Sequence, residues 1–324
     1  MLVSTIIIGV VLLELFVGFA VKDVVAAKKK GVRYNGKTVT AAYAMLSPAV
    51  VLAFLFVLLP IVYSLGYAFT RYELFAPEDI KFNWVENFET IFKDFSKKTD
   101  IYYALKNTAA FVVGVVPLQI GLALGLALFV NNQKKGTGVL KICYFAPVVI
   151  SLSVTSYLWL QILSPSEDGL LNMFLGFFGI EPKHFLLDKD LAMPCIVLMS
   201  AWQGCGYQML IFLSGLTNIR KELYEAAALD GATAWGQFLH VTVPGLRSTF
   251  LFVVVTVFVG ACRVMVQPML LTGYMEHTVT LSYFMYHKGY ESFNVGYSSA
   301  VALLMTIVMG TITFLQRRFL SERD

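Results

Sequence analysis

The sequence has few charged residues: only 14% of its 324 residues are Asp, Glu, Lys or Arg. A soluble domain of ordinary composition has about 25%. By contrast, 57% of the residues are hydrophobic, and the mean hydropathy is +0.70. The core of a soluble protein of 324 residues cannot enclose so much apolar surface, because a soluble domain still needs a charged exterior. The composition excludes a soluble enzyme, a disordered protein and a nucleic-acid binder, and it indicates a protein that lies mainly in lipid.

Cysteine and histidine are scarce, with four of each. Neither residue type shows the paired spacing of a metal site or a disulfide framework. The sequence also has no Gly-x-x-x-x-Gly-Lys-Ser/Thr segment to hold phosphates. We therefore expect no metal, no cofactor and no ATP hydrolysis by this chain itself.

Long apolar runs, on the other hand, are abundant. A helix needs roughly 20 mostly apolar residues to cross a bilayer. The stretches that meet this condition predict an all-α integral membrane protein with seven spans: 2–21, 42–69, 108–130, 139–163, 191–213, 250–271 and 295–314. A shorter run at 170–179 predicts an interfacial or re-entrant helix on the outer side.

Lys and Arg are unevenly distributed between alternate loops. They concentrate in the loops at 22–37, 131–141 and 218–249 and in the tail after 314. Because such loops stay in the cytoplasm, we predict a cytoplasmic carboxyl terminus and an outer amino terminus. Residues 1–40 then form an extra first span with a basic cytoplasmic linker, and residues 41–324 form the main transmembrane domain. The first run lacks a preceding positive segment, so we expect it to be retained and not cleaved as a signal peptide.

The cytoplasmic loop at 218–249 has an unusual composition for a connector. Residues 219–229 are rich in helix formers, Asn218 is a candidate N-cap, and Gly231 suits a helix end that requires a positive φ. Trp235 and Phe238 add a second short apolar element. The alanines at 226–228 leave a flat face on which another protein can dock. The alternative is an amphipathic loop that lies on the membrane, and we favour docking.

The segment Glu225-Ala226-Ala227-x-x-Asp230-Gly231-Ala232 resembles the Glu-Ala-Ala loop of binding-protein-dependent ABC importer permeases. In that family the loop is a coupling helix that seats in a groove of the ATP-hydrolysing subunit. The resemblance therefore implies that Glu225, Ala226, Ala227, Asp230, Gly231 and Ala232 contact an ATPase.

The resemblance covers roughly residues 42–318 and is closest to the carbohydrate branch of type I importers, the maltose and glycerol-phosphate type. Trp84-Val85-Glu86-Asn87-Phe88 and Trp202-Gln203-Gly204 also fit that branch. So does Leu271-Thr272-Gly273, although Tyr274 and Met275 stand where the family usually has a second glycine and a proline. This departure leaves the outer end of the sixth span less certain.

Several properties follow from the resemblance. It implies a six-helix type I permease core, to which the first predicted span is an addition. It also implies a second homologous permease subunit, an ATP-binding cassette ATPase dimer and an extracytoplasmic solute-binding protein. The substrate is then a sugar, with an oligosaccharide as the expected class. This chain is a multi-pass subunit of a prokaryotic cell membrane, not an enzyme.

Polar residues within the spans are candidates for the solute pathway, because ionisable and polar groups in lipid are costly and often functional. Arg263 is placed in mid-span, with Gln267 one helical turn further on the same face. Gln203 and Tyr207 are likewise one turn apart, and the family also directs attention to the last span, where Asn294 and Tyr297 lie. Amides bind sugar hydroxyls and aromatic rings stack on sugar faces.

Each candidate has a structural alternative. Gln203, Tyr207 and Gln267 are equally suited to hydrogen bonding between helices. Arg263 either meets an anionic group of the substrate or pairs with a carboxylate of the partner permease. A secondary transporter or channel without an ATPase is the competing function. It predicts ion-coupling carboxylates near the bilayer midplane, and the stretch 108–314 has no Asp or Glu in such a position.

Overall fold

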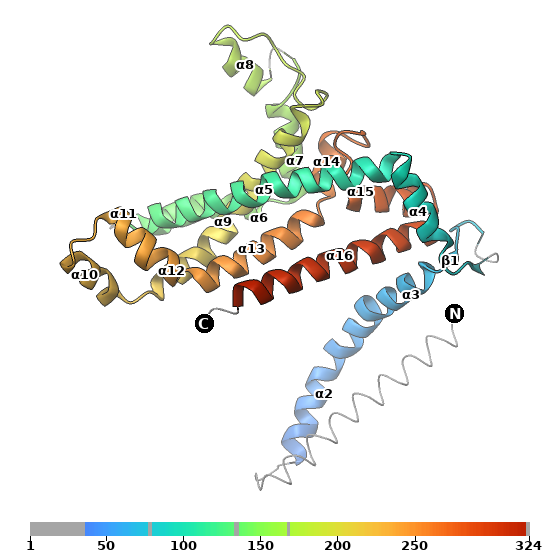
Figure 1. Ribbon diagram of the computed structural model, residues 1–324, viewed down its shortest axis with the longest axis horizontal. Coiled ribbons are helices and arrows are strands. Elements are labelled where there is room, and N and C mark those ends of the chain that lie inside the picture. Colours follow the sequence, from blue (N-terminus) through green and yellow to red (C-terminus); the bar gives the residue numbers. More distant parts are fainter. Residues whose placement is uncertain (1–35, 77–79, 133–135, 167–168, 322–324) are drawn as a thin grey trace. The chain divides into compact units, whose positions relative to one another are not determined.

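The computed structural model describes residues 36–76, 80–132, 136–166 and 169–321 and is mostly helical (Figure 1). By compactness the chain divides into two units, residues 1–68 and 69–324. The predicted first span at 2–21 and most of the basic linker lie outside the described residues.

The helices and strands are α2 (Gly36–Ala53), η1 (Phe54–Leu58), α3 (Leu59–Tyr67), β1 (Thr70–Arg71), β2 (Lys81–Phe82), α4 (Glu86–Ser96), α5 (Asp100–Asn131), α6 (Thr137–Val149), α7 (Leu152–Ile162), α8 (Leu170–Gly176), α9 (Ala192–Thr217), α10 (Lys221–Leu229), α11 (Ala234–Gln237), η3 (Phe238–Thr242), α12 (Val243–Gly245), α13 (Arg247–Cys262), α14 (Val266–Leu271), α15 (Leu281–Tyr286), η4 (His287–Glu291) and α16 (Val295–Ser321).

The described residues contain 4 helices long and apolar enough to cross a membrane, or up to 6 spans if each of two bent pairs counts as one. The predicted spans at 42–69, 108–130, 191–213 and 295–314 each coincide with an unbent candidate span. The stretch at 139–163 is also helical, but α6 and α7 meet there at 95°. The stretch at 250–271 differs from the prediction, because α13 ends at Cys262 and α14 begins only at Val266.

In the first unit, α2, η1 and α3 form one apolar stretch with no buried residue in its most hydrophobic window. The π-helical turn η1 ends two residues before Pro60, and the backbone N–H of Leu59 donates to the carbonyl of Phe54. Proline has no N–H of its own to offer at that point. In the second unit η3 precedes Pro244 in the same way, with Val243 N–H bonded to the Phe238 carbonyl.

The core of the second unit lies between α5 and α9, which pack closely along their length. Every fourth residue of α5 is buried, from Phe111 through Val115 and Gln119 to Ala123 and Ala127. This spacing puts them on one face of the helix. The two alanines are fully buried, and such small side chains let the α9 backbone approach.

The remaining helices surround this pair. α6 packs on α9, α13 contacts α5, α9 and α16, and α7 packs on α14. The short strands β1 and β2 pair antiparallel, and α4 packs on α5 and α16 near the starts of both helices. The loop helices α10 and α11 lie at the opposite end of the bundle formed by the second unit (Figure 1). α8 occupies part of the predicted short apolar run at 170–179.

Gly206→Ala tests the contact between α6 and α9. A methyl group at Gly206 would collide with the backbone carbonyl of Tyr144. We expect it to lower the stability of the purified protein by about 1–3 kcal/mol, the usual cost of overpacking. The measurement is the thermal unfolding midpoint in detergent. Gly121→Ala is the control, because its new methyl group meets nothing within 4 Å, and it should leave the midpoint unchanged or slightly raised. Equal midpoints for the two variants would contradict the packing.

Candidate functional site

A cavity of about 430 Å³ lies between α5, α9, α13 and α14, with one wall from the bend between α6 and α7. We call it the central cavity. Three predicted pathway residues line it: Gln203, Arg263 and Gln267. Apolar groups supply much of the remaining wall, among them Phe111, Val115, Val148, Leu152, Val257 and Val264.

Arg263 lies in the interruption between α13 and α14. Its side chain is exposed, and no hydrogen bond or ion pair of its guanidinium is found within the described part of the chain. The interruption corrects the reasoning from helical spacing, because Arg263 and Gln267 do not belong to one continuous helix. Both nevertheless line the central cavity. The backbone N–H of Arg263 bonds the carbonyl of Gly260, which tightens the last turn of α13.

Gln203 borders the same cavity but already has intramolecular partners. Its Nε2 donates to the carbonyl of Ile150 at 3.3 Å and to Thr155 Oγ1 at 3.2 Å. Ile150 is the C-cap of α6, at the bend before α7. Gln203 thus supplies a donor to a carbonyl that the bend leaves outside a continuous helix. Its amide therefore serves the fold of the α6–α7 bend at the edge of the cavity.

A second pair of glutamines in the cavity was not anticipated from the sequence. Gln119 Nε2 of α5 donates to Gln208 Oε1 of α9 at 2.9 Å, and both side chains are buried. Gly204 makes room for this pair, because a Cβ at that position would collide with the Gln119 amide. The available signal was that both glutamines stand alone within long apolar runs, where an amide needs a partner.

Tyr207 lies in a different place from Gln203. It lines a second cavity of about 490 Å³ between α6, α9 and α13, where its neighbours include Phe145, Ser214 and Phe252. The ring is half-exposed. The structure therefore separates Tyr207 from the glutamines and the arginine of the central cavity.

Asn294 and Tyr297 do not line either cavity. Asn294 Oδ1 accepts a hydrogen bond from the backbone N–H of Tyr297 at the start of α16. Tyr297 is buried, and its hydroxyl donates to Asp94 Oδ2 at 3.1 Å, which ties α16 to the end of α4. Their assignment to the solute pathway stays a prediction. In this structure Asn294 caps the start of α16, and Tyr297 joins α16 to α4.

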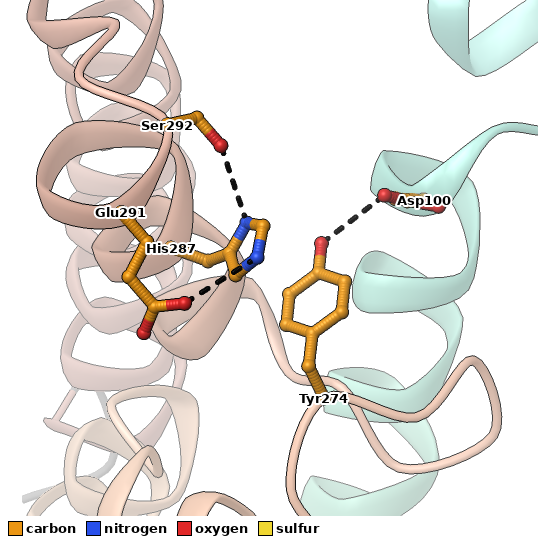
Figure 2. A network of polar contacts seen from close by, with 5 residues as sticks. All are labelled: Asp100, Tyr274, His287, Glu291 and Ser292. Atoms are coloured by element: carbon orange, nitrogen blue, oxygen red, sulfur yellow. Dashed lines mark hydrogen bonds and ion pairs between the residues drawn. The ribbon is translucent and has the colours of Figure 1, made fainter.

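Tyr274, which departs from the family pattern, links its own loop after α14 to the start of α5 and to η4 (Figure 2). Its hydroxyl donates to Asp100 Oδ2 at 3.2 Å, and its ring stacks on His287 with centroids 4.0 Å apart. His287 Nε2 lies 3.5 Å from Glu291 Oε2. Burial raises the pKa of Tyr274, and the nearby Asp100 carboxylate raises it further. The phenol therefore stays protonated and keeps its role as a donor.

The predicted coupling loop forms α10, α11 and η3. Gly231 ends α10 with φ +81°, as its position predicts. Asn218 is not the N-cap of this helix, because it is the C-cap of α9, and Arg220 precedes α10. Leu229 is 89% exposed, next to the Glu-Ala-Ala segment. No side chain of α10 is fully buried.

The base of the loop is bound to the core. Tyr224 and Thr242 share a hydrogen bond of 3.0 Å between their hydroxyl groups. Tyr224 and Val241 pack on the buried cluster that includes Phe212 and Leu246. A Cβ at Gly245 would meet the Ile219 side chain at 2.7 Å, so the two ends of the loop approach closely. The loop therefore presents exposed residues from a base that is part of the bundle.

Residues 119–323 match the family described as the inner membrane component of binding-protein-dependent transport systems. The chain belongs to this family. It is 32% identical over 281 residues to a probable ABC transporter permease, YesP of Bacillus subtilis, with 85% of this chain and 88% of YesP covered. It is 31% identical over 286 residues to the lactose transport system permease LacF of Rhizobium radiobacter, with 86% and 93% covered. Members of the family are membrane components of transport systems, not enzymes.

The fold has a solved counterpart. The structure agrees with a chain of a bacterial ABC transporter that imports the acidic polysaccharide alginate, with a TM-score of 0.77 and 22% sequence identity. The match covers 89% of this chain and 97% of the other. The chain therefore has the fold of a type I importer permease.

The pair Gln119 and Gln208 allows a double-mutant test of the cavity wall. Gln119→Leu or Gln208→Leu alone leaves one buried amide unpaired, so we expect each to lower stability by about 1–3 kcal/mol. The double variant removes both amides and should cost less than the sum of the two single changes. Thermal unfolding midpoints of the four proteins give the coupling. Strictly additive losses would show that the two side chains do not bond to each other.

Proposed function

We propose that this protein is the membrane-spanning permease subunit of an ATP-driven importer for sugars, with an oligosaccharide as the preferred class of substrate. It forms half of the translocation pathway beside a second homologous permease. A separate ATPase dimer supplies the energy, and a soluble binding protein delivers the solute. The observation that carries this proposal is the position of the central cavity. It borders the bend between α6 and α7 and the break between α13 and α14, in a bundle that also holds an exposed Glu-Ala-Ala loop.

The sugar class is supported by the names of several relatives. Besides the lactose permease, the chain is 28% identical to the arabinooligosaccharides permease AraP of Bacillus subtilis, over 90% of this chain. The chemistry of the cavity agrees with such a solute. Amide and guanidinium groups stand among apolar walls, and this mixture suits a molecule with hydroxyl groups on its edges and apolar ring faces.

Arg263 extends the proposal to acidic sugars. Its guanidinium reaches a cavity that contains no other charged residue among those that line it. A carboxylate on the solute would give it a charge-assisted bond, whereas a neutral sugar would not neutralise the charge. A carboxylate of the second permease is the alternative partner for the guanidinium.

The coupling mechanism rests on the base of the loop. When nucleotide binding closes the ATPase dimer, the groove that holds α10 moves, and the packed base formed by Tyr224, Val241 and Leu246 moves α9 and α13 with it. Because Gln203 lies on α9 and Arg263 directly follows the last residue of α13, a rigid-body rotation of these helices changes the access to the central cavity. Glu225 through Ala232 are the residues that we assign to the ATPase contact.

The membrane arrangement is part of the same proposal. The cytoplasmic side is the end of the second unit that holds α10 and α11, so the carboxyl terminus is inside. A first span at residues 2–21 brings the count to seven and puts the amino terminus outside. Residues 1–40 then form an added span and linker, and residues 41–324 form the permease domain.

Substitutions at the exposed tip of the loop test the coupling. Leu229→Asp adds a charge to an apolar contact, and Gly231→Val forces a β-branched residue into a left-handed backbone conformation. We expect both to reduce copurification of the ATPase and to abolish stimulation of ATP hydrolysis by the solute-loaded binding protein. The fold should survive Leu229→Asp, because the side chain is 89% exposed.

Gly236→Ala is the matched control for these loop variants. Its added methyl group makes only ordinary contacts within the loop, at 3.5 Å or more, so assembly and stimulated hydrolysis should match the unaltered protein. If Leu229→Asp and Gly231→Val also leave both properties normal, the loop is not the ATPase contact. A complex that transports solute without any ATPase would favour the secondary transporter or channel.

Arg263→Gln tests the charge of the solute. We expect uptake of an oligouronate by the reconstituted importer to fall by about tenfold or more, because a charge-assisted hydrogen bond is lost. Uptake of a neutral oligosaccharide of equal length should change much less. An equal effect on both sugars would exclude recognition of an acidic group, and it would favour a structural pairing of Arg263 within the assembled importer.

A further inference from the structure

The interruption between α13 and α14 leaves backbone groups that a continuous helix would satisfy. In a regular helix the carbonyl of Val264 would accept from the N–H four residues later, which is the position of Pro268. Proline has no N–H. A carbonyl without a donor is costly at membrane depth, so this carbonyl needs another partner.

Thr280 supplies that partner. Its Oγ1 donates to the carbonyl of Val264 at 2.6 Å, and its side chain is 1% exposed. Two residues further on, Ser282 Oγ donates to the carbonyl of Cys262 at 3.4 Å. The start of α15 and the residue before it thus provide hydroxyl donors to the carbonyls of the two residues that flank Arg263, which are Cys262 and Val264.

The segment that carries Thr280 is itself fixed to α5. Asn107 Nδ2 donates to the carbonyls of Glu276 and Val279, at 2.8 and 2.9 Å. The backbone N–H of Leu281 donates to Thr108 Oγ1 at 2.8 Å. Since these bonds hold the backbone on both sides of Thr280, the hydroxyl group has a defined position relative to the bundle. The core helix α5 therefore determines where the 263–265 turn lies.

We propose that Thr280 is a positioning residue for transport, because it holds the 263–265 turn open and so keeps the Arg263 side chain in the central cavity. The inference rests on the proposed function for the role of Arg263 toward solute, but the position of the turn can be measured without any solute. Pro268 removes the competing helical hydrogen bond, and Thr280 stabilises the open turn that results. The two residues act together at the same carbonyl.

The experiment uses the importer assembled with its ATPase and second permease, after replacement of the four native cysteines of this chain by serine or alanine. Arg263→Cys then reports the position of the turn through its rate of reaction with the anionic probe 2-sulfonatoethyl methanethiosulfonate. The rate is compared in the background of T280V, which removes the hydroxyl with little change in shape, and T280S, which keeps a hydroxyl.

Thr278→Val is the matched control. Thr278 is fully buried in the same segment, and its hydroxyl pairs with Thr272 at 2.8 Å and not with the interruption. We expect T280V to slow the reaction at position 263 by about tenfold, the effect of one lost bond to a buried carbonyl. T280S and T278V should stay near the rate of the parent. Equal rates in all backgrounds, or equal slowing by T278V and T280V, would overturn the proposal.

A second variant covers the case in which T280V alone fails to assemble. P268A restores an N–H that can bond the Val264 carbonyl, so P268A/T280V should assemble while position 263 remains slow to react. Rescue of assembly together with a rate equal to the parent would overturn the positioning role. If the thiol rates agree with the proposal while Arg263→Gln affects neutral and acidic sugars equally, only the solute assignment fails.

Discussion

Inside a bilayer a backbone carbonyl needs a donor from the protein or from enclosed water, and this requirement determines the centre of the second unit. The helices break at two places there: α6 and α7 meet at 95°, and α13 ends at Cys262 before α14 begins at Val266. Each break leaves a carbonyl group without its helical donor, and a side chain from elsewhere in the chain donates to it. Gln203 of α9 donates to the carbonyl of Ile150, and Thr280, just before α15, donates to the carbonyl of Val264. The central cavity lies between these two breaks, whose carbonyl groups are hydrogen-bonded in this way.

This arrangement explains how a cationic residue can be kept within a mostly apolar bundle. Arg263 leaves the helix at the point where α13 ends, so its side chain enters a cavity instead of lipid. A guanidinium at the carboxyl end of a helix also meets the negative end of the helix dipole. The same helix, α13, begins next to the coupling loop, where Leu246 belongs to the buried cluster that anchors the loop. One helix thus connects the exposed loop with the charged cavity wall.

The sequence predicted much of this organisation because its strongest signals are local. Long apolar runs locate the spans, and the Glu225–Ala232 segment with Gly231 locates a helix that ends with a positive φ. The interruption at Arg263 was not predicted, because it depends on a hydroxyl group at position 280 and on anchors at positions 107 and 108 in a distant helix. Helical spacing predicted that Arg263 and Gln267 share one face of a continuous helix. That reason was wrong, although both residues line the same cavity.

Other residues show the same limit. Gln203 and Tyr207 are one turn apart in the sequence, yet they line different cavities, because α9 has neighbours on more than one side. Tyr274 replaces a glycine of the family pattern, and only the fold shows that its ring and hydroxyl fasten α5 to η4. Such roles depend on partners that are far away in the chain, so they cannot be read from spacing.

The central claim is that the cavity between the interrupted spans is the route of the solute. Gln267→Cys in a chain without other cysteines tests this claim most directly. The control is Val113→Cys, because Val113 is 74% exposed on the outside of the span α5, does not line the cavity, and therefore faces lipid in the proposed arrangement. The account predicts that a charged, water-soluble thiol reagent modifies position 267 and not position 113 in the assembled importer. It also predicts that the transported sugar, delivered by the binding protein, protects position 267. Equal labelling at both positions, without protection by the sugar, would contradict the account.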